Sequence, residues 1–234
     1  MVDSLPIVLV PGLLCSARLF AEQLPALWQL GPVTVADHRR DSDVASIARR
    51  ILAHAPPRFA LVGLSMGGYI SFELLRQAPE RIARVVLLDT TARADLPEQS
   101  ERRQALIALA REGHFPEVPD LLFPRFVHRA RQTDPVLRGL VRQMAEETGA
   151  DAFIRQEMAI LSRPDSRPSL AAIRCPTTVI VGDGDELTPP DLAREIASGV
   201  PGARLIEIAQ AGHLSPLERP AEVTAALIGA LREQ

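Results

Sequence analysis

One pentapeptide, Gly63-Leu64-Ser65-Met66-Gly67, constrains what this chain can fold into more than any other stretch. A short apolar run, residues 59–62, precedes it, and residues 66–77 carry apolar side chains at helical spacing. A serine on a sharp turn between a strand and a helix has strained backbone geometry and an exposed hydroxyl. The pentapeptide alone is common by chance. The strand and the helix around it favour a nucleophilic serine over an ordinary glycine-rich loop.

In this setting, residues 63–68 resemble the nucleophile elbow of the α/β-hydrolase superfamily, in its small esterase and lactonase-like branch. The resemblance implies that Ser65 is the nucleophile. The N–H of Met66, at the start of the helix, is unpaired and points toward developing negative charge. A second oxyanion-hole donor is expected from the loop after the first strand, where many members have His-Gly and this chain has Pro11-Gly12. By that match, Leu13 supplies the second N–H.

Alternating strands and helices are predicted along most of the chain. The strand patterns lie at residues 7–10, 33–36, 59–64, 84–88, 177–181 and 203–208, and the helical patterns lie after Ser16 and at 43–54, 66–77 and 221–232. This alternation predicts an α/β protein with a doubly wound, mainly parallel six-stranded sheet. Compared with the superfamily, its first two strands are expected to be missing.

Residues 91–174 interrupt the alternation with four helical stretches at 98–111, 119–131, 134–147 and 151–161. A segment of this length is too long for a structureless loop in a compact domain. We therefore predict a core domain of residues 1–90 and 175–234 and a helical cap of residues 91–174. The resemblance implies a lid that shapes substrate choice. The apolar stretch 121–127 is expected to pack partly on the core and to line the pocket with Phe123 and Phe126.

The loop after the strand at 177–181 carries two aspartates, Asp183 and Asp185, shortly before Pro189. It resembles the acid loop of the superfamily, which implies that Asp185 is the acid of a catalytic triad. Asp183 and Asp89 remain alternatives, because some relatives place the acid after the preceding strand. The aspartate pair lacks further ligands at EF-hand spacing, and no dinucleotide-binding glycine pattern is present. We expect no metal and no cofactor.

The segment from Gly212 to Pro220 resembles the G-H-x-x-x-x-E-x-P histidine loop of the superfamily. A lone histidine is more often structural than catalytic. His213 differs from the other four because it follows the last strand and completes the order serine, acid, histidine. Cys15, near the first loop, is either a reactive thiol or a small packing residue, and we favour packing.

Composition sets the outer limits. The chain has 234 residues, 47% hydrophobic and 24% charged, with a net charge of −3, which suits one α/β domain with an insertion. Neither nucleic-acid nor membrane binding is indicated. Two cysteines are too few for a disulfide framework. We expect no signal peptide, a cytoplasmic location, a monomer or small homo-oligomer, and a small-molecule ester as the binding partner.

These patterns predict a serine hydrolase that cleaves a small or medium, largely apolar carboxylic ester through an acyl-enzyme. One alternative, implied by the resemblance, is a C–C bond hydrolase or a lyase like those of the menaquinone pathway. Such substrates are anionic, and Arg93, Arg125, Arg129 and Arg142 could bind them, although solvated cap arginines are the simpler interpretation. Another alternative is a non-catalytic ligand-binding member of the fold.

Overall fold

The computed structural model describes residues 4–232 and arranges them around a sheet of parallel strands. The six strands found in these residues are β1 (Ile7–Val10), β2 (Val33–Val35), β3 (Phe59–Leu64), β4 (Ile82–Leu88), β5 (Thr177–Gly182) and β6 (Arg204–Ile208). Their order across the sheet is β2-β1-β3-β4-β5-β6, and each neighbouring pair is parallel. The predicted α/β fold with a doubly wound sheet is confirmed.

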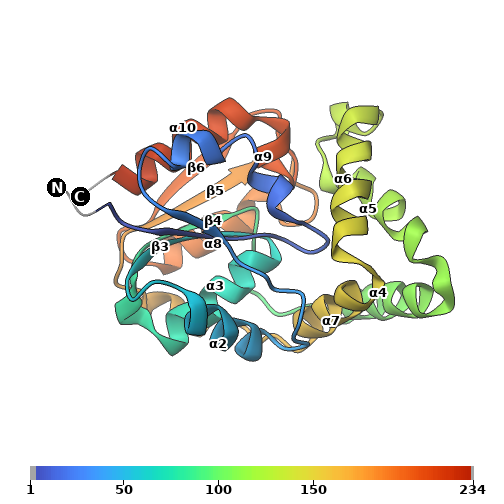
Figure 1. Cartoon of the computed structure of the whole chain (residues 1–234), viewed down its shortest axis with the longest axis horizontal. Helices are drawn as coiled ribbons and strands as arrows, with labels where there is room; N and C mark the ends of the chain where they lie inside the picture. The colour runs from blue at the N-terminus through green and yellow to red at the C-terminus, as the bar shows by residue number, and fades with distance from the viewer. Residues whose placement is uncertain (1–3, 233–234) are drawn as a thin grey trace.

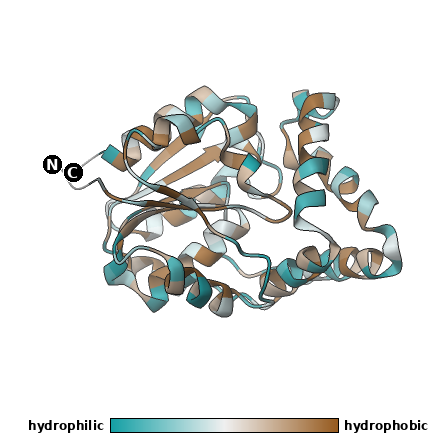
Figure 2. Ribbon diagram, in the orientation of Figure 1, coloured by the Kyte–Doolittle hydropathy of each residue, from teal (hydrophilic) through white to brown (hydrophobic). Residues whose placement is uncertain are grey.

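Helices cover both faces of the sheet because successive strand side chains point to opposite sides. On one face, Val8 and Val10 pack in a cluster with α2 (Val44–His54), α3 (Met66–Gln77) and α8 (Pro190–Gly199). On the other face, Ile7 and Leu9 pack with α1 (Leu24–Leu27) and α10 (Pro220–Arg232). Figure 2 shows the strands mostly in hydrophobic colours and the hydrophilic residues concentrated on the helices. Two hydrophobic layers therefore fix the sheet that carries the elbow.

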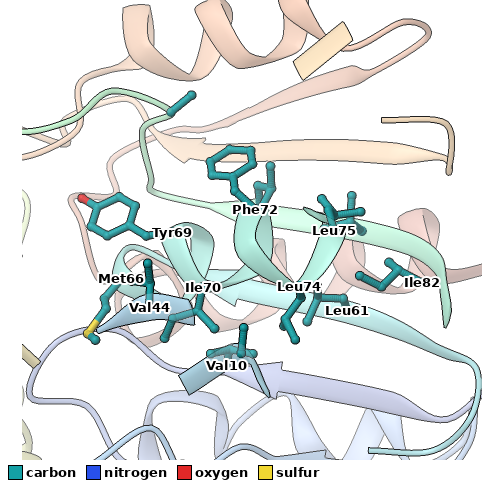
Figure 3. Close-up of a cluster of buried hydrophobic side chains, with 14 of the residues drawn as sticks. Val10, Val44, Leu61, Met66, Tyr69, Ile70, Phe72, Leu74, Leu75 and Ile82 are labelled. Carbon is teal, nitrogen blue, oxygen red and sulfur yellow. The ribbon is translucent and has the colours of Figure 1, made fainter. Parts of the chain in front are cut away.

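The elbow helix α3 is almost completely enclosed. Its apolar side chains, among them Ile70 and Leu74, lie against Val10 and Leu61 of the sheet (Figure 3). The helix starts directly after Ser65, so the packing of α3 on the sheet determines where that serine lies.

The segment between β4 and β5 is helical, as predicted. It contains α4 (Pro97–Leu109), η3 (Ala110–His114), η4 (Phe115–Glu117), α5 (Val118–Phe126), η5 (Arg129–Arg131), α6 (Pro135–Thr148), α7 (Ala150–Leu161) and η6 (Arg167–Ala172). Figure 1 shows α4 to α7 gathered beyond one end of the sheet. Within residues 4–232, no helix has the length and apolar character required to span a membrane. The division into a core domain and a cap with boundaries at 90/91 and 174/175 stays a prediction.

Two predicted helices differ from expectation. The helix expected after Ser16 is divided into a short 3-10 helix, η1 (Ala17–Phe20), and α1 (Leu24–Leu27). The other is shorter than predicted. The pattern at 119–131 predicts a continuous helix, but α5 ends at Phe126 and Val127 is extended, with φ −124° and ψ 155°. Tertiary hydrogen bonds account for the break, because the Phe126 carbonyl accepts the Leu214 N–H at 2.9 Å. The N–H of His128 donates to Glu218 at 2.7 Å. Contacts with a distant loop thus override the local helical pattern.

Gly67 offers a direct test of how closely α3 approaches the sheet. A Cβ at this position would lie 2.0 Å from the Val10 carbonyl oxygen and 2.9 Å from that of Pro11. We expect Gly67→Ala to destabilise the protein by at least about 2 kcal/mol, since a backbone contact cannot yield without moving the helix. The matched control is Gly139→Ala on α6, where a Cβ meets nothing within 4 Å. It should stabilise by about 0.5–1 kcal/mol. Urea unfolding measures both, and equal effects would contradict the close approach.

Candidate active site

Ser65 lies between β3 and α3 with φ 54° and ψ −113°, a conformation that non-glycine residues rarely adopt. Its N–H donates to the Leu88 carbonyl at 2.9 Å, which ties the turn to the neighbouring strand. A Cβ at Gly63 would lie 2.4 Å from the Gly67 carbonyl oxygen, so a side chain there would push the turn apart. The predicted strained turn at Ser65 is therefore present, and the surrounding packing holds it in place.

Three side chains from distant parts of the chain form one hydrogen-bonded row. His213 Nε2 lies 2.8 Å from Ser65 Oγ, and His213 Nδ1 lies 2.8 Å from Asp185 Oδ2. Asp185 follows β5 and His213 follows β6, so parallel strands deliver all three to the same edge of the sheet. Both Asp185 and His213 are buried, at 3% exposure each. The structure brings together the residues that the sequence predicts as nucleophile, acid and base.

Asp185 is held in place by its own loop. Its Oδ1 accepts the N–H groups of Leu187 at 2.8 Å and Thr188 at 3.0 Å, and the Thr188 hydroxyl donates to Oδ2 at 2.7 Å. Burial alone would raise the pKa of Asp185, but the charge of His213 and these hydrogen bonds outweigh burial and lower it. For His213, burial alone would lower the pKa, but the charge and hydrogen bond of Asp185 outweigh it and raise the pKa. The pair therefore favours a charged carboxylate beside an imidazole that readily takes a proton.

The two alternative acids lie elsewhere. Asp183 is exposed. Asp89 is fully buried and accepts the Gly182 N–H at 2.8 Å and the Ser215 hydroxyl at 2.5 Å. Burial raises the pKa of Asp89 well above its ordinary value, and the nearby charge of Asp185 adds to this effect. Asp89 thus joins β4 to β5 and the histidine loop, whereas Asp185 is the carboxylate that contacts the imidazole.

The loop after β1 approaches the serine closely. A Cβ at Gly12 would lie 3.3 Å from the Ser65 Cβ. Leu13 lines the same pocket as Ser65. Among the described residues, the Leu13 N–H has no hydrogen-bond acceptor. These placements are compatible with the predicted donor at Leu13. Met66 is the first residue of α3, directly after Ser65, which is compatible with the second predicted donor.

A buried polar pair that sequence reasoning missed supports this loop. His38 Nε2 lies 3.0 Å from the Gly12 carbonyl oxygen, and Gln156 Oε1 accepts the Leu14 N–H at 3.2 Å. The two side chains also meet, with Gln156 Nε2 3.2 Å from His38 Nε2. Leu14 has φ 60°, so its backbone is strained, and the Gln156 contact comes from α7 of the helical segment. No local pattern marks either residue, because the contact joins positions 142 apart in the chain.

Glu218 secures the histidine loop. Its carboxylate accepts the Gly212 N–H at 2.8 Å and the His128 N–H at 2.7 Å. Glu218 is the glutamate of the histidine-loop pattern, so its position could be found from sequence although its partners could not. The Phe126 ring stacks on His213 with centroids 6.2 Å apart. The end of α5 and the histidine loop are therefore a single packed unit.

A pocket opens between the sheet and the helical segment. It is lined by Ser65 and His213 and also by side chains of α4, α5 and α7. Phe126 lines it, but Phe123 does not: Phe123 is fully buried beneath the Arg138 guanidinium, 4.5 Å from its ring centroid. This placement makes Phe123 part of the packing rather than of the pocket wall.

Cys15 also lines the pocket, yet burial raises the pKa of its thiol to about 12. A thiol with this pKa stays protonated near neutral pH, which supports a packing role. In residues 4–232, no group of three or more histidine, cysteine, aspartate or glutamate side chains is arranged to hold a metal ion.

The sequence matches a known protein family. The family model described as the alpha/beta hydrolase fold matches residues 31–220, well over half of the chain. The chain belongs to the α/β-hydrolase family. The resemblance predicted from the elbow, acid and histidine motifs is confirmed.

Several family members are similar along most of their length. A pimeloyl-[acyl-carrier protein] methyl ester esterase of Neisseria meningitidis is 24% identical over 216 residues, which are 88% of this chain and 83% of that protein. A thermophilic esterase from Thermogutta terrifontis is 28% identical, with a TM-score of 0.87, covering 97% of this chain and 89% of that chain. The enol-lactonase from Burkholderia xenovorans LB400 is 27% identical, with a TM-score of 0.90, covering 99% and 92%. Relatives of this α/β hydrolase thus include esterases and a lactonase.

The pKa of His213 should respond differently to replacement of the two buried aspartates, Asp185 and Asp89. Asp185→Asn removes the charge that outweighs burial, so the pKa of His213 should fall. Asp89→Asn should lower it less, because burial already opposes ionisation of Asp89. NMR titration of the imidazole nitrogens measures the shift, with exposed Asp183→Asn as the control. A larger fall in Asp89→Asn would reverse the assignment of the partner.

Proposed function

We propose that this α/β hydrolase cleaves a small or medium carboxylic ester through a covalent acyl-enzyme on Ser65. The observation that carries the proposal is the row Ser65, His213, Asp185, with both hydrogen-bond distances at 2.8 Å. A serine hydroxyl is a weak nucleophile unless a neighbouring base takes its proton, and this geometry supplies that base. Leu64 and Phe126 give the pocket beside the serine an apolar wall, which suits an apolar group next to the reacting carbonyl.

In the acylation step, Ser65 Oγ forms a bond to the carbonyl carbon while its proton moves to His213 Nε2. Negative charge develops on the former carbonyl oxygen and is stabilised by the N–H groups of Met66 and Leu13. When the intermediate collapses, the bond to the alcohol oxygen breaks and that oxygen takes the proton from His213. Asp185 holds the imidazole in the required tautomer and stabilises the imidazolium.

Deacylation repeats the sequence with water. His213 removes a proton from the water, the hydroxide oxygen attacks the acyl carbon, and the same N–H donors stabilise the second oxyanion. Breakage of the acyl–Ser65 bond returns the proton to Oγ and releases the acid. Every proton moves between substrate, water, Ser65 and His213, so the cycle needs no cofactor.

Ser65→Ala is the direct test. The change removes one oxygen from the turn, so turnover of p-nitrophenyl esters should fall by at least about 10³-fold while the melting temperature is retained. A fluorophosphonate probe should label the wild type and not the variant. As a comparison, Ser169→Ala on η6 removes a hydroxyl that donates to the Ser166 carbonyl, and it should keep full activity. Wild-type turnover in Ser65→Ala would contradict the proposal.

A substitution at Gln156 tests whether its hydrogen bond holds the loop after β1 in position beside Ser65. Gln156→Leu leaves the strained Leu14 without its N–H acceptor, which should let residues 12–14 move away from the site. We expect kcat to fall by about 10- to 100-fold with a smaller change in KM, because the lost interaction acts mainly in the transition state. Gln132→Leu, which removes an amide that donates to the Pro124 carbonyl at the surface, is the matched control. A loss confined to KM would show that Gln156 contacts substrate instead.

A further inference from the structure

The pocket that Ser65 lines contains both apolar and charged side chains. Leu64, Phe126 and several leucines are its apolar members. The charged groups that also line the pocket are Arg93, Asp95, Arg102, Arg103, Arg125, Glu157 and Arg163. Five cations and two anions in the pocket lining are an excess of positive charge. Which of these groups form ion pairs with one another decides which cations remain for a ligand.

Two of these arginines and both carboxylates form a cluster of ion pairs with one another. Arg103 contacts Asp95 at 2.7 Å and Glu157 at 2.8 Å, and Arg163 contacts Asp95 at 2.8 Å. Burial also raises the pKa of Glu157, which opposes its ionisation. Because of these ion pairs, neither carboxylate in the pocket lining is left to pair with Arg93, Arg102 or Arg125.

Arg93 is neutralised from outside the cluster. Its guanidinium forms a two-pronged contact with Glu195: Nε donates to Oε2 at 2.9 Å and Nη2 donates to Oε1 at 2.9 Å. Arg102 and Arg125 are the remaining cations. Among the described residues, neither forms an ion pair or a hydrogen bond through its guanidinium.

The surroundings of Arg125 disfavour its positive charge. It is half-buried, and burial, followed by the charges of Arg102 and Arg103, lowers its pKa. A partly buried guanidinium without an anion is unfavourable, and a carboxylate bound in two-pronged fashion would relieve it. Its position also matters, because Arg125 directly precedes Phe126, whose ring stacks on His213.

We propose that Arg125, assisted by Arg102, binds a carboxylate that the ester substrate carries in addition to its reacting group. The proposal rests on the hydrolase function proposed above and revises the largely apolar substrate expected from sequence. The apolar lining residues contact the chain next to the reacting carbonyl, and Arg125 and Arg102 bind the anionic end. The preferred substrate class is then the half-ester of a dicarboxylic acid, or a lactone bearing a free carboxylate.

The test compares two esters of one acid, monomethyl glutarate and dimethyl glutarate, by pH-stat titration. The wild type should favour the monoester in kcat/KM by about tenfold or more, the range expected for one charge-assisted contact. Arg125→Gln should reduce the ratio of the two kcat/KM values by about 10- to 100-fold, and Arg125→Lys should keep part of it. Arg102→Gln should have a smaller effect, because Arg102 is exposed.

Arg129→Gln is the matched control, since Arg129 is an exposed arginine of the same segment that does not line the pocket. It removes the same charge and should leave the ratio unchanged. A wild-type ratio at or below one, or an equal fall in Arg125→Gln and Arg129→Gln, would overturn the proposal.

A binding measurement separates this inference from the proposed function. Calorimetry should detect glutarate binding to Ser65→Ala, with loss of binding when Arg125→Gln is added. Glutarate binding that depends on Arg125, without hydrolysis of either ester by the wild type, would refute the esterase function and keep the carboxylate site. Hydrolysis of both esters without preference, and without glutarate binding, would refute the carboxylate site and keep the esterase.

Discussion

The close approach of α3 to the end of β1 is the contact on which the rest of the site depends. It exists because Gly67 presents no side chain to the Val10 carbonyl, and because Gly63 presents none to the turn itself. Because neither glycine has a side chain, the helix packs closely enough to keep Ser65 in a strained backbone conformation. The strain is held by the packing of a twelve-residue helix against the sheet rather than by any single strong bond.

The parallel sheet does the remaining positioning. Because β3, β5 and β6 all end at the same edge, three loops far apart in the sequence converge without any long-range pattern having to encode their contact. This explains why local sequence predicts so much here. The apolar runs define the strands, the order of strands defines the edge, and the loop that follows each strand carries its side chain into the shared space. Strand order explains why the three motif loops meet, and the resemblance to the superfamily assigned Ser65, Asp185 and His213 within them.

What the sequence does not reveal depends on contacts between distant segments. Residues 119–131 have a helical pattern, yet the chain leaves the helix at Val127 because its backbone groups bond to the histidine loop. Phe123 and Phe126 are equivalent in sequence, but only one faces the pocket. His38 and Gln156 carry no motif, and their role is visible only once the loop after β1 and α7 are side by side. The pairing of the pocket arginines is likewise a property of the fold, since composition cannot say which cation lacks an anion.

The two hydrogen bonds that Glu218 accepts from the N–H groups of His128 and Gly212 have a consequence for engineering this protein. Helical segments over the pocket are attractive units to exchange between related enzymes, and a natural splice would replace residues 91–174 as a block. In this chain that cut would sever the His128 N–H from its acceptor and remove the ring that stacks on His213. A working chimera therefore has to import the extended residues around 127 together with a matching histidine loop. The two stretches, 90 residues apart, form a single module for transplantation.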